Sequence, residues 1–330
     1  MPTDMTGAPA AGDDAWLSLT VVGKAEVATD IWLFTLASAM HGAAARLPEF
    51  AAGSHVTVIT PAGMRRNYSL CSAPADRSHY QIAVKREANG RGGSRSMVDD
   101  VEVGTQLMLS APRNNFSLDR RAKAFLFVAG GIGITPILSM MRQLKATGAA
   151  PFHLYYCTRD AASSAFATEL ANEFPGQFTM HHDGGVAAQA FDFWPLFESP
   201  TAAHVYCCGP KGLMEAVADM SGHWPSGAIH FESFGVGATA LLENTAFDVR
   251  LRSSGQVIHV ATQCSILDAL RAAGISVRSS CESGTCASCK TGLIEGEADH
   301  RDMVLTDGER TSSIMVCVSR SRSPELLLDL

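Results

Sequence analysis

The stretch 281-CESGTCASCK-290 decides the C-terminal part of the fold, and together with Cys317 it indicates a metal centre. Cys281, Cys286 and Cys289 have the C-x4-C-x2-C spacing of plant-type [2Fe–2S] clusters, which also need a distant fourth thiolate. Cys317 is the candidate for that ligand. The residues between the cysteines are mostly small, so the loop can wrap closely and aim backbone N–H groups at the sulfurs. The sequence therefore predicts an iron–sulfur centre.

Two other uses of cysteine fit the sequence less well. Zinc sites usually combine two C-x2-C pairs, whereas here three ligands crowd one loop. A disulfide framework suits small secreted domains, and this chain is long and has nine cysteines, an odd number. The cysteines outside the cluster motif are expected to be small buried hydrophobes, as free cysteines usually are: Cys71, Cys157, Cys207, Cys208 and Cys264.

Length and composition indicate an ordinary globular protein of two or three domains. The 330 residues are 46% hydrophobic and 18% charged, and the net charge of −7 argues against nucleic acid as a main partner. No run of 18 apolar residues occurs, and the N-terminus lacks the basic and then apolar pattern of a signal peptide. We expect a flexible tail over residues 1–14 and a cytoplasmic protein without a membrane partner.

The first domain, residues 15–119, contains short alternating apolar runs, which predict an antiparallel β-barrel. Within it lies 66-RNYSLCSAP-74, where Arg66 and Tyr68 share one face of an extended segment and Ser69 points to the other. A guanidinium can grip a phosphate and a tyrosine can cover a flat ring, so the combination suits a flavin nucleotide. Alone, the motif also fits an exposed arginine beside a strand tyrosine.

A second signal follows at 85-KREANGRGGSRS-96. Gly92 and Gly93 precede Ser94, and consecutive small residues at a helix start present backbone N–H groups that can bind an anion. The alternative is a flexible hairpin loop. The two signals together favour a flavin site more than either does alone.

The second domain, residues 120–232, alternates strands with helices, which predicts a parallel sheet. The run AFLFVA (124–129) reads as a buried strand, GGIGITP (130–136) as a turn against a pyrophosphate, and the following amphipathic segment as a helix that ends at Gly148. Thr135 and Pro136 stand where the Rossmann fingerprint has its last glycine, so a different nicotinamide-binding lineage is indicated.

Two further groups follow strand ends of the same sheet, where ligands bind. One is Thr158, Arg159 and Asp160; the other is Cys208, Gly209 and Pro210. Asp160 is a candidate for the adenosine ribose hydroxyls, which would favour NADH over NADPH, although Arg159 beside it weakens that interpretation. An aspartate after a strand otherwise caps a helix.

The third domain, residues 245–330, follows a linker at 233–244. Its sequence predicts a hairpin around Ser254–Gly255 and then a helix that begins at a capping box, with Ser265 as N-cap and Asp268 three positions on, and that stops at Gly274. The cysteine loop comes next, and the apolar segment IMVCVS is expected to be a strand that carries Cys317. Together these elements predict a compact α+β module.

With all three segments in view, the chain resembles the phthalate dioxygenase reductase family, which includes vanillate O-demethylase reductases. The resemblance covers Trp16 to Leu330 and rests on six motifs in order: RNYSLCSAP, NGRGGS, AGGIGITP, CCGP, HFESF and CESGTCASC. It implies a flavin barrel of ferredoxin-reductase type, a parallel-sheet α/β NAD-binding domain and a C-terminal β-grasp ferredoxin domain. Family members with this domain order carry FMN.

The resemblance also implies roles for single residues. Arg66 and Ser94 would hold the FMN phosphate, and Tyr68 and Ser69 would address the ring. Phe231 would pack near the flavin; without the resemblance it is more simply a core residue. Catalytic roles fall to Ser69, Thr135 and Cys208; no His/Asp constellation is evident near Cys208 in the sequence, so its role is to pack or to position the nicotinamide rather than to act as a nucleophile. The nicotinamide site would be shaped by Gly131, Gly133, Thr135 and Cys208. The remaining candidate cofactor contacts are Asn67, Val84, Lys85, Gly92, Gly93, Gly130, Pro136, Thr158, Arg159, Asp160, Gly209 and Pro210.

The implied activity is that of an NADH-dependent reductase, a monomer that passes electrons through FMN and a [2Fe–2S] cluster to a Rieske-type oxygenase component. Two alternatives remain: a stand-alone diaphorase or flavin reductase, and a non-enzymatic zinc module, against which the flavin and nicotinamide signals argue. Beside the cysteine loop, Glu282 and Lys290 are candidates for docking the partner, or simply solvated charges.

Overall fold

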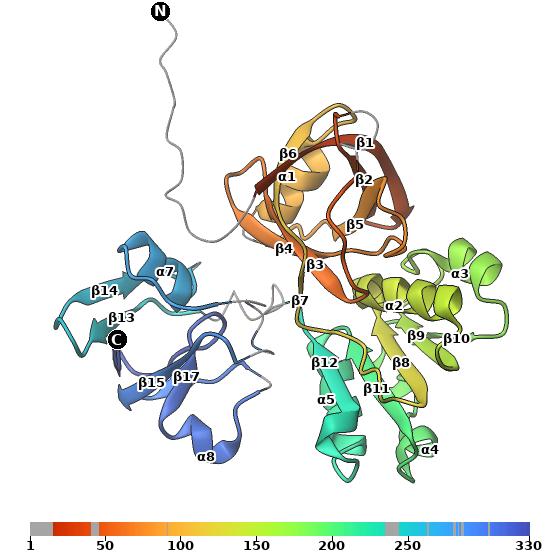
Figure 1. The fold of residues 1–330 in the computed structure, drawn as a ribbon. Helices are drawn as coiled ribbons and strands as arrows, with labels where there is room; N and C mark the ends of the chain where they lie inside the picture. Colours follow the sequence, from red (N-terminus) through yellow and green to blue (C-terminus); the bar gives the residue numbers. More distant parts are fainter. Residues whose placement is uncertain are drawn as a thin grey trace, which may run out of the picture.

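The computed structural model describes residues 16–40, 46–90, 92–234, 244–262, 264–279, 282, 284, 287–302 and 304–330. These residues form a β-barrel, an α/β domain and a smaller C-terminal sheet domain, drawn in red to orange, yellow to green, and blue in Figure 1. The predicted multidomain fold is thereby confirmed. Among the described residues, no helix is both long and apolar enough to cross a bilayer.

The first domain is an antiparallel barrel whose strands run in the order β4-β3-β6-β1-β2-β5, with β7 paired to β3. A bridge between Leu70, just after β4, and Ile82 in β5 joins the two ends of the sheet. The barrel encloses a core of its own, which includes Phe34, Val56 and Leu109. The elements are β1 (Trp16–Ala28), β2 (Ile31–Ala37), β3 (Ser54–Ile59), β4 (Arg65–Ser69), β5 (His79–Lys85), α1 (Gly93–Asp100), β6 (Gln106–Ser110) and β7 (Arg113–Asn114).

The second domain is a parallel sheet in the order β10-β9-β8-β11-β12. Its strands β8 and β11 lie side by side, so the glycine turn after β8 and the Cys208–Pro210 turn after β11 meet at the same sheet edge. The elements are β8 (Ala124–Gly130), α2 (Ile134–Thr147), β9 (Phe152–Thr158), α3 (Ala167–Glu173), β10 (Phe178–His182), α4 (Trp194–Phe197), β11 (Ala203–Cys208), α5 (Lys211–Met220) and β12 (Ile229–Glu232).

Helices cover both faces of this sheet because its strands are apolar on both sides. Side chains of α2 and α3 pack on one face together with Phe127 and Leu154. Side chains of α4 and α5 pack on the other face, around Val128 and Val205. Helix α2 ends as predicted, since Gly148 adopts φ 60° and its N–H donates to the carbonyl of Leu144.

The C-terminal domain is a mixed sheet in the order β14-β13-β19-β15-β17, and α7 packs against it. The capping box of α7 at Ser265 and Asp268 is present as predicted. The expected strand through Cys317 is wrong: β17 stops at Met315, and Cys317 lies in the turn that follows. The elements are β13 (Phe247–Leu251), β14 (Val257–Val260), α7 (Ile266–Ala272), β15 (Lys290–Glu295), β16 (Ala298–Asp299), α8 (Asp307–Arg310), β17 (Ser313–Met315), β18 (Arg320–Ser321) and β19 (Glu325–Leu328).

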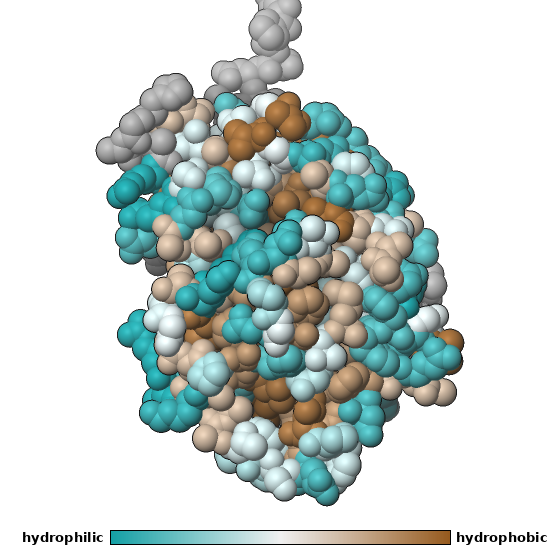
Figure 2. All heavy atoms as spheres, turned by 90° about the vertical axis from the view of Figure 1, so that its right-hand side faces the viewer, coloured by the Kyte–Doolittle hydropathy of each residue, from teal (hydrophilic) through white to brown (hydrophobic). Residues whose placement is uncertain are grey.

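Figure 2 shows the face of the molecule that the barrel and the α/β domain present on the right of Figure 1. Hydrophobic residues gather there in several groups that hydrophilic residues separate. Exposed apolar side chains scattered in this way are usual on protein surfaces.

Candidate flavin, nicotinamide and cluster sites

Strand β4 carries the predicted flavin-binding residues. The hydroxyl of Tyr68 is buried and has no hydrogen-bond partner among the described residues. Burial raises the pKa of Tyr68 well above its ordinary value, and the nearby charge of Arg66 offsets only part of that effect. A buried hydroxyl without a partner is costly, so this position fits a bound group that brings a polar atom. The local structure thus accommodates a flavin.

Three other predicted flavin contacts have partners of their own in the barrel. The Asn67 Oδ1 accepts a hydrogen bond from the Thr57 Oγ1 at 2.7 Å. The Val84 side chain is fully buried in the barrel core. The Lys85 Nζ lies 2.8 Å from a carboxylate oxygen of Glu87. These side chains are thus engaged within the barrel domain, and a role in binding a flavin stays a prediction for all three.

The second flavin signal lies beside the first in space. Gly92 precedes α1 with φ 94°, a conformation that favours glycine. A Cβ on Gly93 would lie 3.0 Å from the Nε of Arg66, so the guanidinium passes directly over the start of α1. The Ser94 Oγ accepts a hydrogen bond from the backbone N–H of Glu87 at 3.1 Å. A guanidinium and a helix N-terminus that converge in this way suit a phosphate.

The glycine turns after β8 and β11 pack backbone against backbone. A Cβ on Gly133 would lie 2.1 Å from the carbonyl oxygen of Cys208, and a Cβ on Gly209 would lie 2.9 Å from the backbone nitrogen of Gly130. Gly131 has φ 52°, and its carbonyl accepts a hydrogen bond from the Tyr156 hydroxyl at 3.1 Å. Glycine is therefore required here by close contact and by backbone conformation.

Thr135 and Pro136 occupy the first turn of α2, as the sequence predicts. The Thr135 Oγ1 donates a hydrogen bond to the Ile132 carbonyl at 3.0 Å, and the side chain is buried. This hydroxyl therefore stabilises the start of the helix. A catalytic role for Thr135 stays a prediction. Pro210 immediately precedes α5 and lies against Gly130, where a Cβ would come within 2.5 Å of its ring.

One buried acidic residue, which sequence reasoning missed, joins the flavin strand to the nicotinamide strands. Glu232 ends β12 opposite Cys208, and the Ser69 Oγ donates a hydrogen bond to its Oε2 at 3.4 Å. Glu232 is only 7% exposed. Burial, followed by the charge of Glu232, raises the pKa of the Cys208 thiol well above its ordinary value. The thiol therefore stays protonated, as expected for a residue that packs rather than attacks.

The signal for Glu232 was present in the sequence. An acidic residue inside 230-HFESF-234, at the end of an apolar strand, is a carboxylate placed at the ligand edge of a parallel sheet. Phe231, the neighbour that was predicted instead, is partly buried and packs against the core on the α4 and α5 face. It also lines a cavity of about 400 Å³ together with Asn115, Phe116, Ser117, Asp119, Ile229 and His230.

The candidate adenosine-binding residues after β9 form a compact turn. The Asp160 carboxylate accepts hydrogen bonds from the backbone N–H and the Oγ of Ser163, both at 2.9 Å. These bonds lower the pKa of Asp160 below its ordinary value. The Thr158 Oγ1 lies 2.7 Å from the Ser164 Oγ. Arg159 is exposed. Asp160 closes this turn and caps no helix, since α3 begins only at Ala167.

Two of the four candidate cluster ligands, Cys281 and Cys286, lie outside the described residues. Cys289 and Cys317 are both buried and belong to one hydrophobic cluster. Gly284, which precedes Cys289 in the chain, adopts φ 79°, and a Cβ there would lie 2.7 Å from a Val318 methyl group. The loop thus passes so close to the turn around Cys317 that only glycine fits. The local packing suits thiolates gathered from both segments.

The two charges considered for partner docking each have a partner within the domain. The Glu282 Oε1 accepts a hydrogen bond from the Arg271 Nη2 at 2.6 Å. The Lys290 Nζ donates to the Glu309 Oε1 at 2.7 Å. Both pairs are partly exposed, so the charges are available at the surface but largely balanced. A docking role for either residue stays a prediction.

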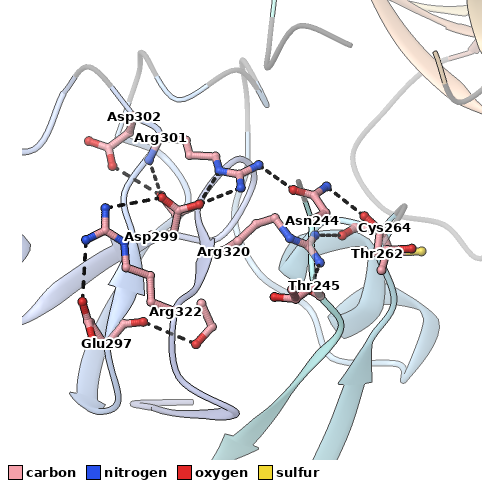
Figure 3. A network of polar contacts seen from close by, with 12 residues as sticks. Asn244, Thr245, Thr262, Cys264, Glu297, Asp299, Arg301, Asp302, Arg320 and Arg322 are labelled. Atoms are coloured by element: carbon pink, nitrogen blue, oxygen red, sulfur yellow. Dashed lines mark hydrogen bonds and ion pairs between the residues drawn. The ribbon is translucent and has the colours of Figure 1, made fainter. Parts of the chain in front are cut away.

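A buried polar network fastens the start of the C-terminal domain to the segment after Cys317 (Figure 3). Arg320 is only 4% exposed, and its guanidinium donates hydrogen bonds to the backbone carbonyls of Cys264, Thr245 and Ala261. The Arg301 Nη1 donates to the Asn244 Oδ1 at 2.7 Å. Asn244 and Thr245 directly follow residues 235–243. Two arginines therefore hold the point at which the chain enters this domain.

Comparisons with known proteins match all three domains. Residues 18–118 match a family model for an oxidoreductase FAD-binding domain, residues 127–183 one for an oxidoreductase NAD-binding domain, and residues 249–322 one for a 2Fe-2S iron–sulfur cluster binding domain.

Relatives and solved structures match nearly the whole chain. The phthalate dioxygenase reductase of Burkholderia cepacia is 55% identical, with 96% of this chain and 98% of that protein covered. The phthalate 4,5-dioxygenase oxygenase reductase subunit of Pseudomonas putida is 53% identical, with the same coverage. A solved phthalate dioxygenase reductase, described as a modular structure for electron transfer from pyridine nucleotides to [2Fe–2S], superimposes with a TM-score of 0.83 at 54% identity, covering 96% of this chain and 98% of that one.

Proposed function

The chain belongs to the phthalate dioxygenase reductase family, and from this premise we propose that it carries electrons from NADH through FMN and a plant-type [2Fe–2S] cluster to the oxygenase component of a Rieske-type system. It is an oxidoreductase with a flavin-binding domain, an NAD-binding domain and a 2Fe-2S domain. Its relatives are reductase subunits of oxygenase systems, which favours this function over that of a stand-alone diaphorase.

The observation that carries the proposal is the junction of Ser69, Cys208 and Glu232. Ser69 ends the strand that holds the flavin-binding residues, whereas Cys208 and Glu232 end two neighbouring strands of the nicotinamide-binding sheet. The 3.4 Å hydrogen bond between Ser69 and Glu232 joins the two domains at this point. A nicotinamide bound at the sheet edge and a flavin bound along β4 would therefore meet here.

Bound flavin and cluster would supply the exchange between a two-electron hydride donor and a one-electron acceptor. The chain supplies binding and orientation. Arg66 and the N-terminus of α1 would hold the flavin phosphate, and Tyr68 would contact the ring. The glycine turns would let a nicotinamide approach the backbone closely. Ser69 and Glu232 would exclude water and orient the reacting edge through their hydrogen bond.

The choice of FMN over FAD is part of the proposal. The arginine and helix start around Gly93 provide one phosphate site close to the strand that would hold the ring. The iron–sulfur domain follows the flavin domain in the chain, and the family resemblance associates this order with FMN. The flavin released from the protein on denaturation identifies the cofactor. FAD in that extract would contradict this part of the proposal.

The preference for NADH and the cluster ligands are proposed on similar grounds. Asp160 lies after β9, where a carboxylate can accept from ribose hydroxyls, and its ionised form is favoured by Ser163. Cys281, Cys286, Cys289 and Cys317 would complete the cluster. A cytoplasmic location accords with free thiols at every described cysteine.

The test is reconstitution with an oxygenase component. The purified protein should contain a flavin together with about two iron atoms and two sulfides per chain. Cys317→Ser should keep NADH-driven bleaching of the flavin and lose electron transfer to the oxygenase. A colourless protein that contains zinc would contradict the proposal. Equal loss of both activities in Cys317→Ser would contradict the order of transfer.

A further inference from the structure

Helix α2 runs from the nicotinamide-binding turn to the wall of the barrel. Its first turn follows the Gly131–Gly133 turn, and its middle faces the segment just after β4. That segment, Cys71 and Ser72, comes two and three residues after Ser69 in the motif proposed to bind the flavin. Any shift of α2 against this segment would therefore move the two binding sites relative to each other.

Arg142, in the third turn of α2, ties three parts of the molecule together. Its Nη1 donates a hydrogen bond to the carbonyl of Cys71 in the barrel at 2.7 Å. Its Nε and Nη2 bind the Glu173 carboxylate on α3 in a bidentate manner, at 3.0 and 2.5 Å. The Arg142 side chain is 15% exposed and that of Glu173 is 34% exposed. Bidentate geometry with partial burial makes this a firm contact.

Two neighbours on the same face of α2 make weaker contacts with the barrel. The Ser139 Oγ donates to the Ser72 carbonyl at 3.1 Å, and the Gln143 Oε1 accepts from the backbone N–H of Ala52 at 3.0 Å. Both residues are neutral, and among the described residues neither side chain makes a hydrogen bond to a second helix. Residues three and four apart share one helix face, so Ser139, Arg142 and Gln143 form a single row that docks α2 onto the barrel.

We propose that Arg142 is a positioning residue for hydride transfer, which it serves by fixing α2 and its nicotinamide-binding turn against the flavin-binding segment of the barrel. The inference rests on the proposed function. Loss of the guanidinium would leave the Cys71 carbonyl and the Glu173 carboxylate without this partner, so the row on α2 would loosen. Hydride transfer depends steeply on the placement of its two rings, since a misplacement of about 1 Å can cost about 100-fold in rate.

The experiment compares Arg142→Gln and Arg142→Lys with the wild type and with Arg250→Gln as a matched control. Arg250 also binds a carboxylate in a bidentate manner, that of Glu325, but within the sheet of the C-terminal domain. Stopped-flow absorbance gives the limiting rate of flavin reduction at saturating NADH and the NADH dissociation constant. The long-wavelength charge-transfer absorbance of the nicotinamide stacked on the flavin gives a second readout, independent of turnover.

Arg142→Gln should lower the limiting rate by about tenfold or more and weaken the charge-transfer band, with flavin content and NADH affinity within about twofold of the wild type. Arg142→Lys should show a smaller loss of the same kind, because a single ammonium replaces a two-sided fork. Arg250→Gln should match the wild type. Should Arg142→Gln fail to fold, Arg142→Lys decides.

A wild-type limiting rate and charge-transfer band in Arg142→Lys or Arg142→Gln would overturn the inference. A loss confined to NADH affinity would overturn it as well, because that result assigns Arg142 to binding. Failure of the proposed function looks different, since the wild-type protein itself would then show no reduction of its flavin by NADH.

Discussion

Replacing Gly133 by alanine should separate nicotinamide binding from the rest of the electron path. The new Cβ would lie 2.1 Å from the carbonyl oxygen of Cys208 and 2.5 Å from its carbonyl carbon. Both are backbone atoms, so no side chain can turn away. Carbon–oxygen contacts settle at about 3.3 Å or more, and the two turns must therefore part by about 1 Å. Overpacking of this kind costs about 1–3 kcal/mol of stability.

The functional loss should exceed the loss of stability, because the parted turns are those proposed to bind the nicotinamide. A displacement of about 1 Å predicts up to about 100-fold slower reduction of the flavin by NADH. Flavin and iron content should be unchanged, since the flavin and cluster sites lie elsewhere. Stopped-flow absorbance measures the rate, and denaturant unfolding measures the stability.

The matched control for this prediction is Gly212→Ala in α5. A Cβ at Gly212 meets no atom within 4 Å, and alanine favours the helix, so stability should stay the same or rise by up to about 1 kcal/mol. Reduction of the flavin should proceed at the wild-type rate. Rapid reduction by NADH in Gly133→Ala, at wild-type affinity, would refute the placement of the nicotinamide at these turns.

Three further predictions concern the barrel and the C-terminal domain. Tyr68→Phe removes a buried hydroxyl without a described partner, so the flavin-free protein should gain about 1 kcal/mol in stability. The affinity for the flavin, measured by fluorescence quenching, should fall about tenfold. Unchanged affinity would contradict the placement of the flavin. Burial raises the pKa of Cys71 to about 12 from an unfolded value of 9.0. The contribution of the protonated thiol to stability is therefore complete below pH 9 and is lost as pH rises toward 12. The free energy of unfolding should fall less steeply between pH 8 and about 11 in Cys71→Ala than in the wild type, and parallel curves would contradict this prediction. Arg320→Gln should destabilise the C-terminal domain by about 3 kcal/mol in thermal unfolding. The control Arg322→Gln makes the same charge change at a side chain that is 64% exposed, and it should cost less than about 0.5 kcal/mol. Similar losses in the two variants would show that the buried hydrogen bonds of Arg320 contribute little to stability.

The parts of the fold that local chemistry dictates were predictable from the sequence. The continuous apolar run at 124–129 became β8, and the glycines at 131 and 133 marked the turn that follows it. The helix from Ile266 began at its predicted capping box. In each case the residues that decide the conformation are neighbours in the chain, so their pattern is visible without a structure.

Contacts between distant segments were not predictable in the same way. The sequence places Glu232 at the ligand edge of the sheet, but it does not show the hydrogen bond with Ser69, which lies 163 residues earlier in the chain. In the sequence, Arg142 is one charged residue of an amphipathic helix. Its contacts with Cys71 and Glu173 are visible only in the structure. The apolar run around Cys317 is buried, but the strand ends at Met315. The chain turns there because the backbone N–H groups of Val318 and Ser319 both donate to the carbonyl of Met315.

The arginine network around Asn244 and Thr245 sets the natural cutting point between the electron-accepting module and the rest of the chain. A fragment that starts at Asn244 keeps every described partner of Arg301 and Arg320, while one that starts at β13 discards two of them. Asn244 and Thr245 therefore belong to the packed C-terminal domain rather than to the segment that connects it to the α/β domain. A fragment meant to retain these hydrogen bonds therefore has to begin at or before Asn244.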